Sequence, residues 1–115
     1  MNNLEVMLNN TSKYEIAEEN TDLSIYLEKL NLDKNIALAI GEIVNNKMTI
    51  QHIRLISETQ PNVKVITQNG YEILVVMESY NSKEIEKVLN NQPTFILLGN
   101  VIVNKNTIQT VEPII

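Results

Sequence analysis

The residues that could do chemistry in this chain are few and scattered. His52 is the only histidine, and there is no cysteine. Hydrolytic sites need a nucleophile beside a base, and metal sites need several converging His, Cys or carboxylate ligands. Neither pattern occurs, and the three glycines are isolated, whereas phosphate-binding loops need glycine clusters. We therefore expect no catalytic, cofactor-binding or metal-binding residues, and a protein that works by binding.

Charge is spread unevenly along the chain. Residues 1–45 hold eight acidic and three basic residues, whereas residues 46–115 hold six of each, which gives a net charge of −5. A protein that binds a nucleic-acid backbone usually has a clustered basic face, and none is visible. The acidic half is either a solvated face that aids solubility or a surface for a basic protein, and an acidic DNA mimic is a special case of the second reading. The candidate protein-binding residues are Glu15, Glu18, Glu19, Asp22 and Glu28.

The bulk properties predict a small cytoplasmic protein. A chain of 115 residues is one domain's worth, and the lack of cysteine fits a reducing compartment. The N-terminus has no secretory signal pattern, and no apolar run approaches the roughly 18 residues needed to span a membrane. The abundance of Asn and Ile suggests an AT-rich bacterial or phage genome. We expect no membrane partner, and no internal repeat is apparent.

The N-terminal third predicts a hairpin and a helix. Residues 4–8 and 13–17 alternate between apolar and polar types around a four-residue loop. Thr21 then suits an N-cap, and apolar residues at helical spacing follow over residues 23–30. Residues 36–44 fit a strand or a helix. A strand is favoured because Asn45–Asn46 suits a tight turn, followed by a returning strand over residues 48–56.

The remaining segments are mostly extended. Asn69–Gly70 is the strongest hairpin signal in the chain, and it joins strands over residues 63–67 and 71–77. A helix over residues 83–89 ends before Pro93. Two strands then flank Gly99–Asn100, and a last extended piece contains Pro113, which suggests a sheet edge. Such an edge, near residues 111–115, could pair between chains. The predicted fold is α+β, mostly antiparallel, with two short helices.

The order of these segments resembles the LytTR family of bacterial DNA-binding output domains. The helix phrase Ser82–Leu89 is similar to the family's Ser-Leu-x-Glu-Leu-Glu helix, and the strand phrase Phe95–Asn104 to its Phe-x-Arg-x-His-Arg-Ser-Tyr-x-Val-Asn strand. The match covers about residues 36–113, and its most specific anchors are Val103–Asn104 and Ile108. It divides the single domain into an acidic hairpin plus helix, residues 1–35, and a β-rich LytTR-like part, residues 36–115.

The matching strand departs from the family at its charged positions. Ile96, Leu98 and Gly99 stand where the family has Arg, His and Arg, which are the residue types that reach phosphates and base edges. We therefore favour a non-enzymatic regulatory module that acts through protein contacts, either as a homo-oligomer or against a basic partner. The alternative is a LytTR-like regulator that binds DNA as a dimer. Its available polar contacts are His52, Arg54, Lys64, Asn100, Asn104 and Lys105.

Overall fold

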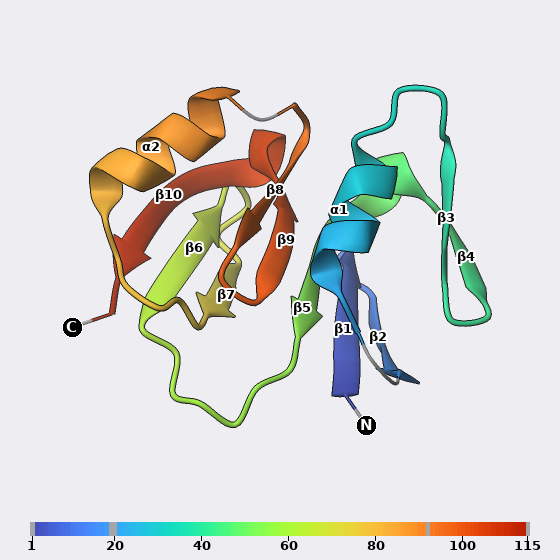
Figure 1. Ribbon diagram of the computed structural model, residues 1–115, viewed down its shortest axis with the longest axis horizontal. Helices are drawn as coiled ribbons and strands as arrows, with labels where there is room; N and C mark the ends of the chain where they lie inside the picture. Colours follow the sequence, from blue (N-terminus) through green and yellow to red (C-terminus); the bar gives the residue numbers. More distant parts are fainter. Residues whose placement is uncertain (1, 19–20, 92, 115) are drawn as a thin grey trace.

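The computed structural model describes residues 2–18, 21–91 and 93–114, which form an α+β fold of antiparallel strands and two α-helices (Figure 1). The first half contains β1 (Asn2–Leu8), β2 (Lys13–Glu18), α1 (Leu23–Leu30), β3 (Ala37–Ile40), β4 (Ile43–Asn46), the 3₁₀ helix η1 (Lys47–Thr49) and β5 (Ile50–Leu55). The second half contains β6 (Val63–Thr67), β7 (Glu72–Val75), α2 (Ser82–Asn91), β8 (Phe95–Leu98), β9 (Val101–Asn104), η2 (Lys105–Thr107) and β10 (Ile108–Pro113).

The described strands form three sheets of unequal size. The largest has five strands in the order β2-β1-β5-β9-β8, so β5 joins the N-terminal hairpin to the β8–β9 hairpin. The second has three strands in the order β10-β6-β7, and the third is the isolated β3–β4 hairpin. Neither described α-helix is long and apolar enough to cross a membrane.

Several predicted elements are confirmed with small shifts. The N-terminal hairpin forms as expected, and so does the hairpin at Asn69–Gly70. Helix α1 begins one residue later than its predicted cap implied, because Asp22 rather than Thr21 accepts the hydrogen bond from the Ser24 backbone N–H. Asn81 caps α2 through bonds from two backbone N–H groups.

The prediction of one continuous strand over residues 36–44 is wrong. The chain turns at Gly41, whose φ of 60° lies in the left-handed region that suits glycine, and strands β3 and β4 pair on either side of it. The predicted turn at Asn45–Asn46 instead ends β4, and the Asn46 side chain caps η1 by accepting from the Met48 backbone N–H.

The prediction that the chain has no internal repeat is also wrong. The order hairpin, α-helix, hairpin, 3₁₀ helix, strand occurs twice, in residues 2–55 (the first repeat) and in residues 63–113 (the second repeat). Six of the eleven residues in 41–51 recur in 99–109, at an offset of 58. The boundary between the repeats lies near residue 60, whereas the sequence suggested a division at residues 35 and 36.

The hydrogen bonds of the two repeats match at equivalent positions. Asn46 and Asn104 each cap a 3₁₀ helix, both with bonds of 3.0 Å. The backbone N–H of Asn9 donates to the Thr49 carbonyl over 2.8 Å, and that of Gln68 donates to the Thr107 carbonyl over the same distance. Most of the shared residues therefore lie in the turns, caps and 3₁₀ helices, and the duplication is one of three-dimensional structure as well as of sequence.

Each repeat has its own apolar core, and the β8–β9 hairpin lies between the two. Phe95 and Ile102 pack into the core of the first repeat. Ile96, Leu98, Val101 and Val103 pack into the core of the second repeat. The β8–β9 hairpin thus belongs to the second repeat by sequence but completes the core of the first.

Candidate functional site

Four of the acidic residues proposed from sequence lie on β2 and at α1: Glu15 and Glu18 on the strand, Asp22 as the N-cap of the helix and Glu28 within it. Glu15 and Glu28 are exposed, while Glu18 accepts a hydrogen bond of 2.5 Å from the Tyr26 hydroxyl. Burial and the Glu18 carboxylate raise the pKa of Tyr26, whereas the hydrogen bonds from Ser24 lower the pKa of Asp22. Glu18 and Asp22 line the same shallow hollow. Glu19 lies outside the described residues.

Four of the six residues of the DNA-binding alternative make side-chain contacts within the fold. Lys64 lies 3.7 Å from Glu72, and the Lys105 ammonium donates to the Leu89 carbonyl. The Asn100 side chain accepts from the Val76 backbone N–H and donates to the Leu55 carbonyl. Asn104 caps η2. Each of these four side chains therefore already has a partner within the fold.

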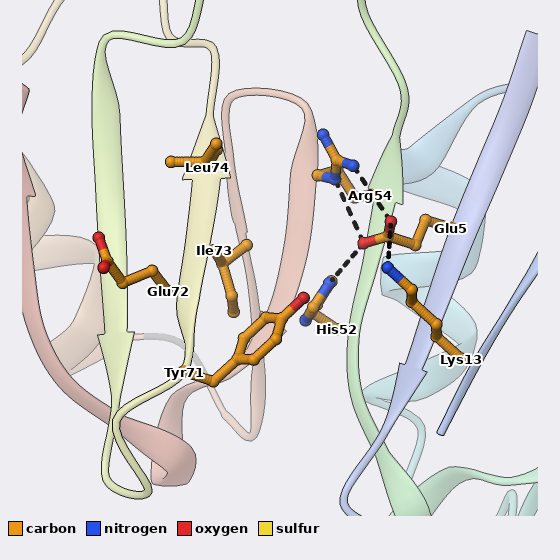
Figure 2. A pocket seen from close by; sticks show the side chains of 8 residues that line it. All are labelled: Glu5, Lys13, His52, Arg54, Tyr71, Glu72, Ile73 and Leu74. Atoms are coloured by element: carbon orange, nitrogen blue, oxygen red, sulfur yellow. Dashed lines mark hydrogen bonds and ion pairs between the residues drawn. The ribbon is translucent and has the colours of Figure 1, made fainter. Parts of the chain in front are cut away.

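His52 and Arg54, the other two residues of that set, belong to a buried ion-pair cluster around Glu5 (Figure 2). Glu5 Oε1 lies 3.3 Å from His52 Nε2, and Glu5 Oε2 lies 3.1 Å from Arg54 Nη2. The hydrogen bond from His52 lowers the pKa of Glu5 most, and the adjacent Arg54 guanidinium adds to this, so that the pKa is about 2 against the usual 4.5 even though burial opposes ionisation.

The cluster has the contacts of a structural ion pair. Glu5 on β1 is the direct cross-strand partner of Arg54 on β5. His52 is 1% exposed, lies with its Nδ1 3.3 Å from Gln51 Oε1, and stacks on Tyr71 with ring centroids 6.1 Å apart. A His–carboxylate pair needs a nucleophile to act in acyl transfer. The side chains that line the adjacent pocket, within the described part of the chain, include neither Ser, Thr nor Cys.

A different region has the features of a binding surface. The sequence predicted the sheet edge near residues 111–115, which the position of β10 confirms, but not the groove beside it. Helix α2 and strand β10 enclose a groove, here called the α2–β10 groove, and β10 has β6 on one side only. The apolar residues that line this groove are Tyr80, Ile85, Leu89, Ile108 and Val111.

In the first repeat, the space equivalent to this groove is occupied by other elements of the same chain. The equivalent space lies between α1 and β5, where β9 pairs with β5 and β8 packs on α1. The Asn31 side chain locks this arrangement, because it donates to the Phe95 carbonyl and accepts from the Phe95 backbone N–H, both over 2.9 Å. In the first repeat a β-hairpin therefore fills the space that the second repeat leaves open.

The β3–β4 hairpin is the second unusual surface. Its inner face packs on the core of the first repeat through Leu38 and Ile40. Its outer face is exposed, with Val44 at 70% and the side chains of Ala37 and Ala39 also open. The equivalents of these residues in the β8–β9 hairpin are Ile102, Phe95 and Leu97, of which the first two are fully buried. The repeated Gly–x–x–x–x–Asn–Lys–x–Thr–Ile–Gln phrase is the sequence signal that could have revealed this correspondence.

Comparison of the chain with protein-family models, with curated proteins and with solved structures finds no match. The resemblance to the LytTR family stays a prediction.

Proposed function

We propose that this protein is a non-enzymatic regulatory module that acts through protein–protein contacts. The observation that carries the proposal is the open α2–β10 groove beside the unpaired edge of β10. In the first repeat the equivalent groove and edge hold a β-hairpin. The second repeat has the same element order and the same capping bonds. Its groove is therefore suited to a β-hairpin from another polypeptide.

The chemistry of the surface fits polypeptide binding by strand addition. An unpaired strand edge offers backbone N–H and C=O groups to an incoming strand, and a neighbouring apolar pocket selects its side chains. The Tyr80 hydroxyl donates to the Val111 carbonyl over 3.2 Å and covers part of this edge. A carbonyl oxygen has two lone pairs, so this bond leaves the acceptor available to a second donor.

The alternative function, LytTR-like DNA binding, draws less support from the described residues. The guanidinium of Arg54 lies against Glu5, and Lys64 lies near Glu72. Nucleic-acid binding draws on Lys and Arg side chains that neutralise phosphates, and each of these two cations lies beside a carboxylate of the same chain. A mobility-shift assay at low salt tests this alternative directly, and a complex that weakens steeply with added salt would favour it over protein contacts.

The proposed function is tested by photo-crosslinking in cells that make the protein. A photoreactive amino acid replaces Thr110, which is exposed and lines the groove, and in a matched control it replaces Leu74, an exposed strand residue outside the groove. We expect polypeptide adducts from position 110 and none from position 74. Absence of any polypeptide adduct at position 110 would contradict the proposed function.

A further inference from the structure

We infer that the polypeptide filling the α2–β10 groove is the β3–β4 hairpin of a second copy of this chain, so that copies join head to tail. The inference rests on the proposed function and names its partner. It starts from the three sheets of the molecule. The five-stranded sheet has the order β2-β1-β5-β9-β8, and the equivalent strands of the other repeat are β7, β6, β10, β4 and β3.

The two smaller sheets are therefore two separate parts of a second five-stranded sheet. The three-stranded sheet supplies β7, β6 and β10, and the two-stranded sheet supplies β4 and β3. Pairing β10 of one copy with β4 of the next would give the order β7-β6-β10-β4-β3. That order reproduces the five-stranded sheet of the first repeat, strand for strand.

The internal pairing also fixes the register between copies. Strand β5 pairs with β9 in antiparallel fashion, with His52 opposite Val103, Ile53 opposite Ile102 and Arg54 opposite Val101. Moving each position by the repeat offset places Thr110 opposite Asn45, Val111 opposite Val44, and Glu112 opposite Ile43 of the next copy.

Burial distinguishes the positions that have a partner from those that lack one. Ile102 and Val101 on β9 are 0% exposed, whereas their equivalents Val44 and Ile43 on β4 are 70% and 42% exposed. On the other strand, Gln51 and His52 of β5 are buried, and their equivalents Gln109 and Thr110 of β10 are exposed. The apolar area that Val44 and Ile43 leave open favours association, because its burial is stabilising.

The two surfaces lie at opposite ends of the molecule, as Figure 1 shows: β10 is at one end of the long axis and the β3–β4 hairpin at the other. A chain cannot satisfy its own groove in this arrangement. An interface between two different surfaces leaves one of each open after every addition, so it gives open chains or closed rings rather than a simple two-fold dimer.

Two residue differences between the repeats should make the contact between copies weaker than the equivalent contact inside the chain. Inside the chain, the Leu55 backbone N–H donates to the Asn100 carbonyl, but the equivalent of Leu55 is Pro113, which has no N–H. The outer face of the β3–β4 hairpin carries Ala37 where the β8–β9 hairpin carries Phe95. We therefore expect association that depends on protein concentration rather than a permanent assembly.

The test is sedimentation velocity of the purified full-length chain over a concentration series. Val44→Lys should block the β4 surface, and Val111→Lys should block the β10 surface. We expect the wild-type protein to pass beyond dimers as concentration rises, and each variant alone to stay monomeric. Leu74→Lys, which changes an exposed apolar strand residue away from both surfaces, should behave as wild type.

Mixing the two blocked variants gives the sharpest result. Val44→Lys keeps an intact β10 surface, and Val111→Lys keeps an intact β4 surface, so an equimolar mixture should form dimers and nothing larger. Wild-type protein that stays monomeric throughout the series, or a mixture that stays monomeric, would overturn head-to-tail pairing. Dimers formed by either variant alone would also overturn it, because they would indicate contact between like surfaces.

A disulfide between copies provides a second test that substitutes only small side chains. The chain contains no cysteine, and directly opposed residues of antiparallel strands have Cα atoms about 4.5–5.5 Å apart, which suits a disulfide. In a glutathione redox buffer, Val44→Cys and Val111→Cys chains should form a mixed dimer in preference to either homodimer. Equal formation with the control Leu74→Cys in place of Val44→Cys would count against the register.

The crosslinking experiment separates failure of this inference from failure of the proposed function. Adducts at position 110 that contain residues 37–46 of the same protein support head-to-tail pairing. Adducts that contain only another protein, together with a wild-type chain that sediments as a monomer, leave the protein-binding function intact and refute self-assembly.

Discussion

The two repeats share one architecture but differ in what completes them. The first repeat, residues 2–55, has a five-stranded sheet because the β8–β9 hairpin pairs with β5 and places Phe95 in its core. The second repeat, residues 63–113, ends in a three-stranded sheet with an open groove beside β10. The same order of elements therefore gives a five-stranded sheet in the first repeat and a three-stranded sheet in the second. This difference identifies the α2–β10 groove as the surface best suited to a partner.

The largest effect should come from removing the side chain that completes the first repeat. Phe95→Ala should lower the free energy of unfolding by about 3–5 kcal/mol, because it leaves a cavity in a fully buried site. Urea denaturation at equilibrium measures this. A loss below about 1 kcal/mol would mean that the β8–β9 hairpin does not hold the first core together.

Ala37 occupies the position in the β3–β4 hairpin that Phe95 occupies in the β8–β9 hairpin, so a substitution there sharpens the comparison of the two repeats. Ala37 is exposed, so Ala37→Phe should change the stability of the monomer by no more than about 0.5 kcal/mol. If the outer face of the β3–β4 hairpin enters the groove of another copy, the larger side chain should strengthen self-association. Sedimentation that shows weaker association than wild type would indicate that this face is not part of the contact.

Gly41 in the turn of the β3–β4 hairpin and Gly99 in the turn of the β8–β9 hairpin should differ in how well they tolerate a side chain. Both have positive φ, 60° for Gly41 and 55° for Gly99. A Cβ at Gly99 would overlap the Val76 carbonyl oxygen, whereas at Gly41 it would lie 3.1 Å from the terminal methyl of the Ile16 side chain, which can move. Gly99→Ala should therefore cost about 2–4 kcal/mol and Gly41→Ala about 1–2 kcal/mol in thermal or urea unfolding. Equal losses of stability in the two variants would indicate that the backbone strain of positive φ determines both, without a contribution from the overlap with the Val76 carbonyl.

The charged pair that joins the N-terminal hairpin to the last strand is reversed between the repeats. Glu5 faces Arg54 in the first repeat, and Lys64 faces Glu112 in the second. Glu5 is 6% exposed, so Glu5→Gln should cost about 1–3 kcal/mol near neutral pH. Glu112 is only half-buried, so Glu112→Gln should cost less, below about 1 kcal/mol.

The same pair predicts how stability depends on pH. The pKa of Glu5 falls to about 2 in the folded protein, so folding favours the ionised carboxylate. Its contribution is complete above the usual pKa of 4.5 and is lost as pH falls from there towards 2. The stability difference between wild type and Glu5→Gln should therefore shrink across this range in urea titrations. A difference that stays constant would contradict the ion-pair account.

The smallest structural effect should come from the acidic face of the first repeat. Glu15→Lys combined with Glu28→Lys changes two exposed residues, so stability should move by no more than about 0.5 kcal/mol. Self-association through β4 and β10 should be unchanged, whereas binding to a basic protein partner, tested by titration with that partner, should weaken. Unchanged affinity would exclude Glu15 and Glu28 from a second surface that binds a basic partner.

Sequence patterns predicted the elements whose signals are local. The Asn69–Gly70 turn and the capped helix α2 follow from the backbone preferences of a few neighbouring residues. The β3–β4 hairpin was missed because residues 36–44 are apolar without a clear period. That pattern has a structural cause: one face of the hairpin packs on the core of the first repeat through Leu38 and Ile40, and the other leaves Val44 exposed.

Pro113 indicated that β10 is a sheet edge, but the groove beside it could not be predicted from single residues, because it exists where the second repeat lacks the hairpin that the first repeat has. Gln109 and Thr110 resemble ordinary edge residues until they are compared with the buried Gln51 and His52. The repeat that makes this comparison possible is carried by a short phrase of turn and cap residues, while the core positions differ in size, as Phe95 and Ala37 do. The acidic residues, in contrast, were proposed from sequence because charge can be read from single residues, and their role in binding stays a prediction.

Amide hydrogen exchange, measured by NMR at low and high protein concentration, tests most directly whether β10 of one copy pairs with β4 of another. We expect slower exchange at high concentration for the edge amides of β10 around Val111 and of β4 around Val44, with no change on β7 around Leu74. Exchange at Val111 and Val44 that is independent of concentration would contradict pairing between copies.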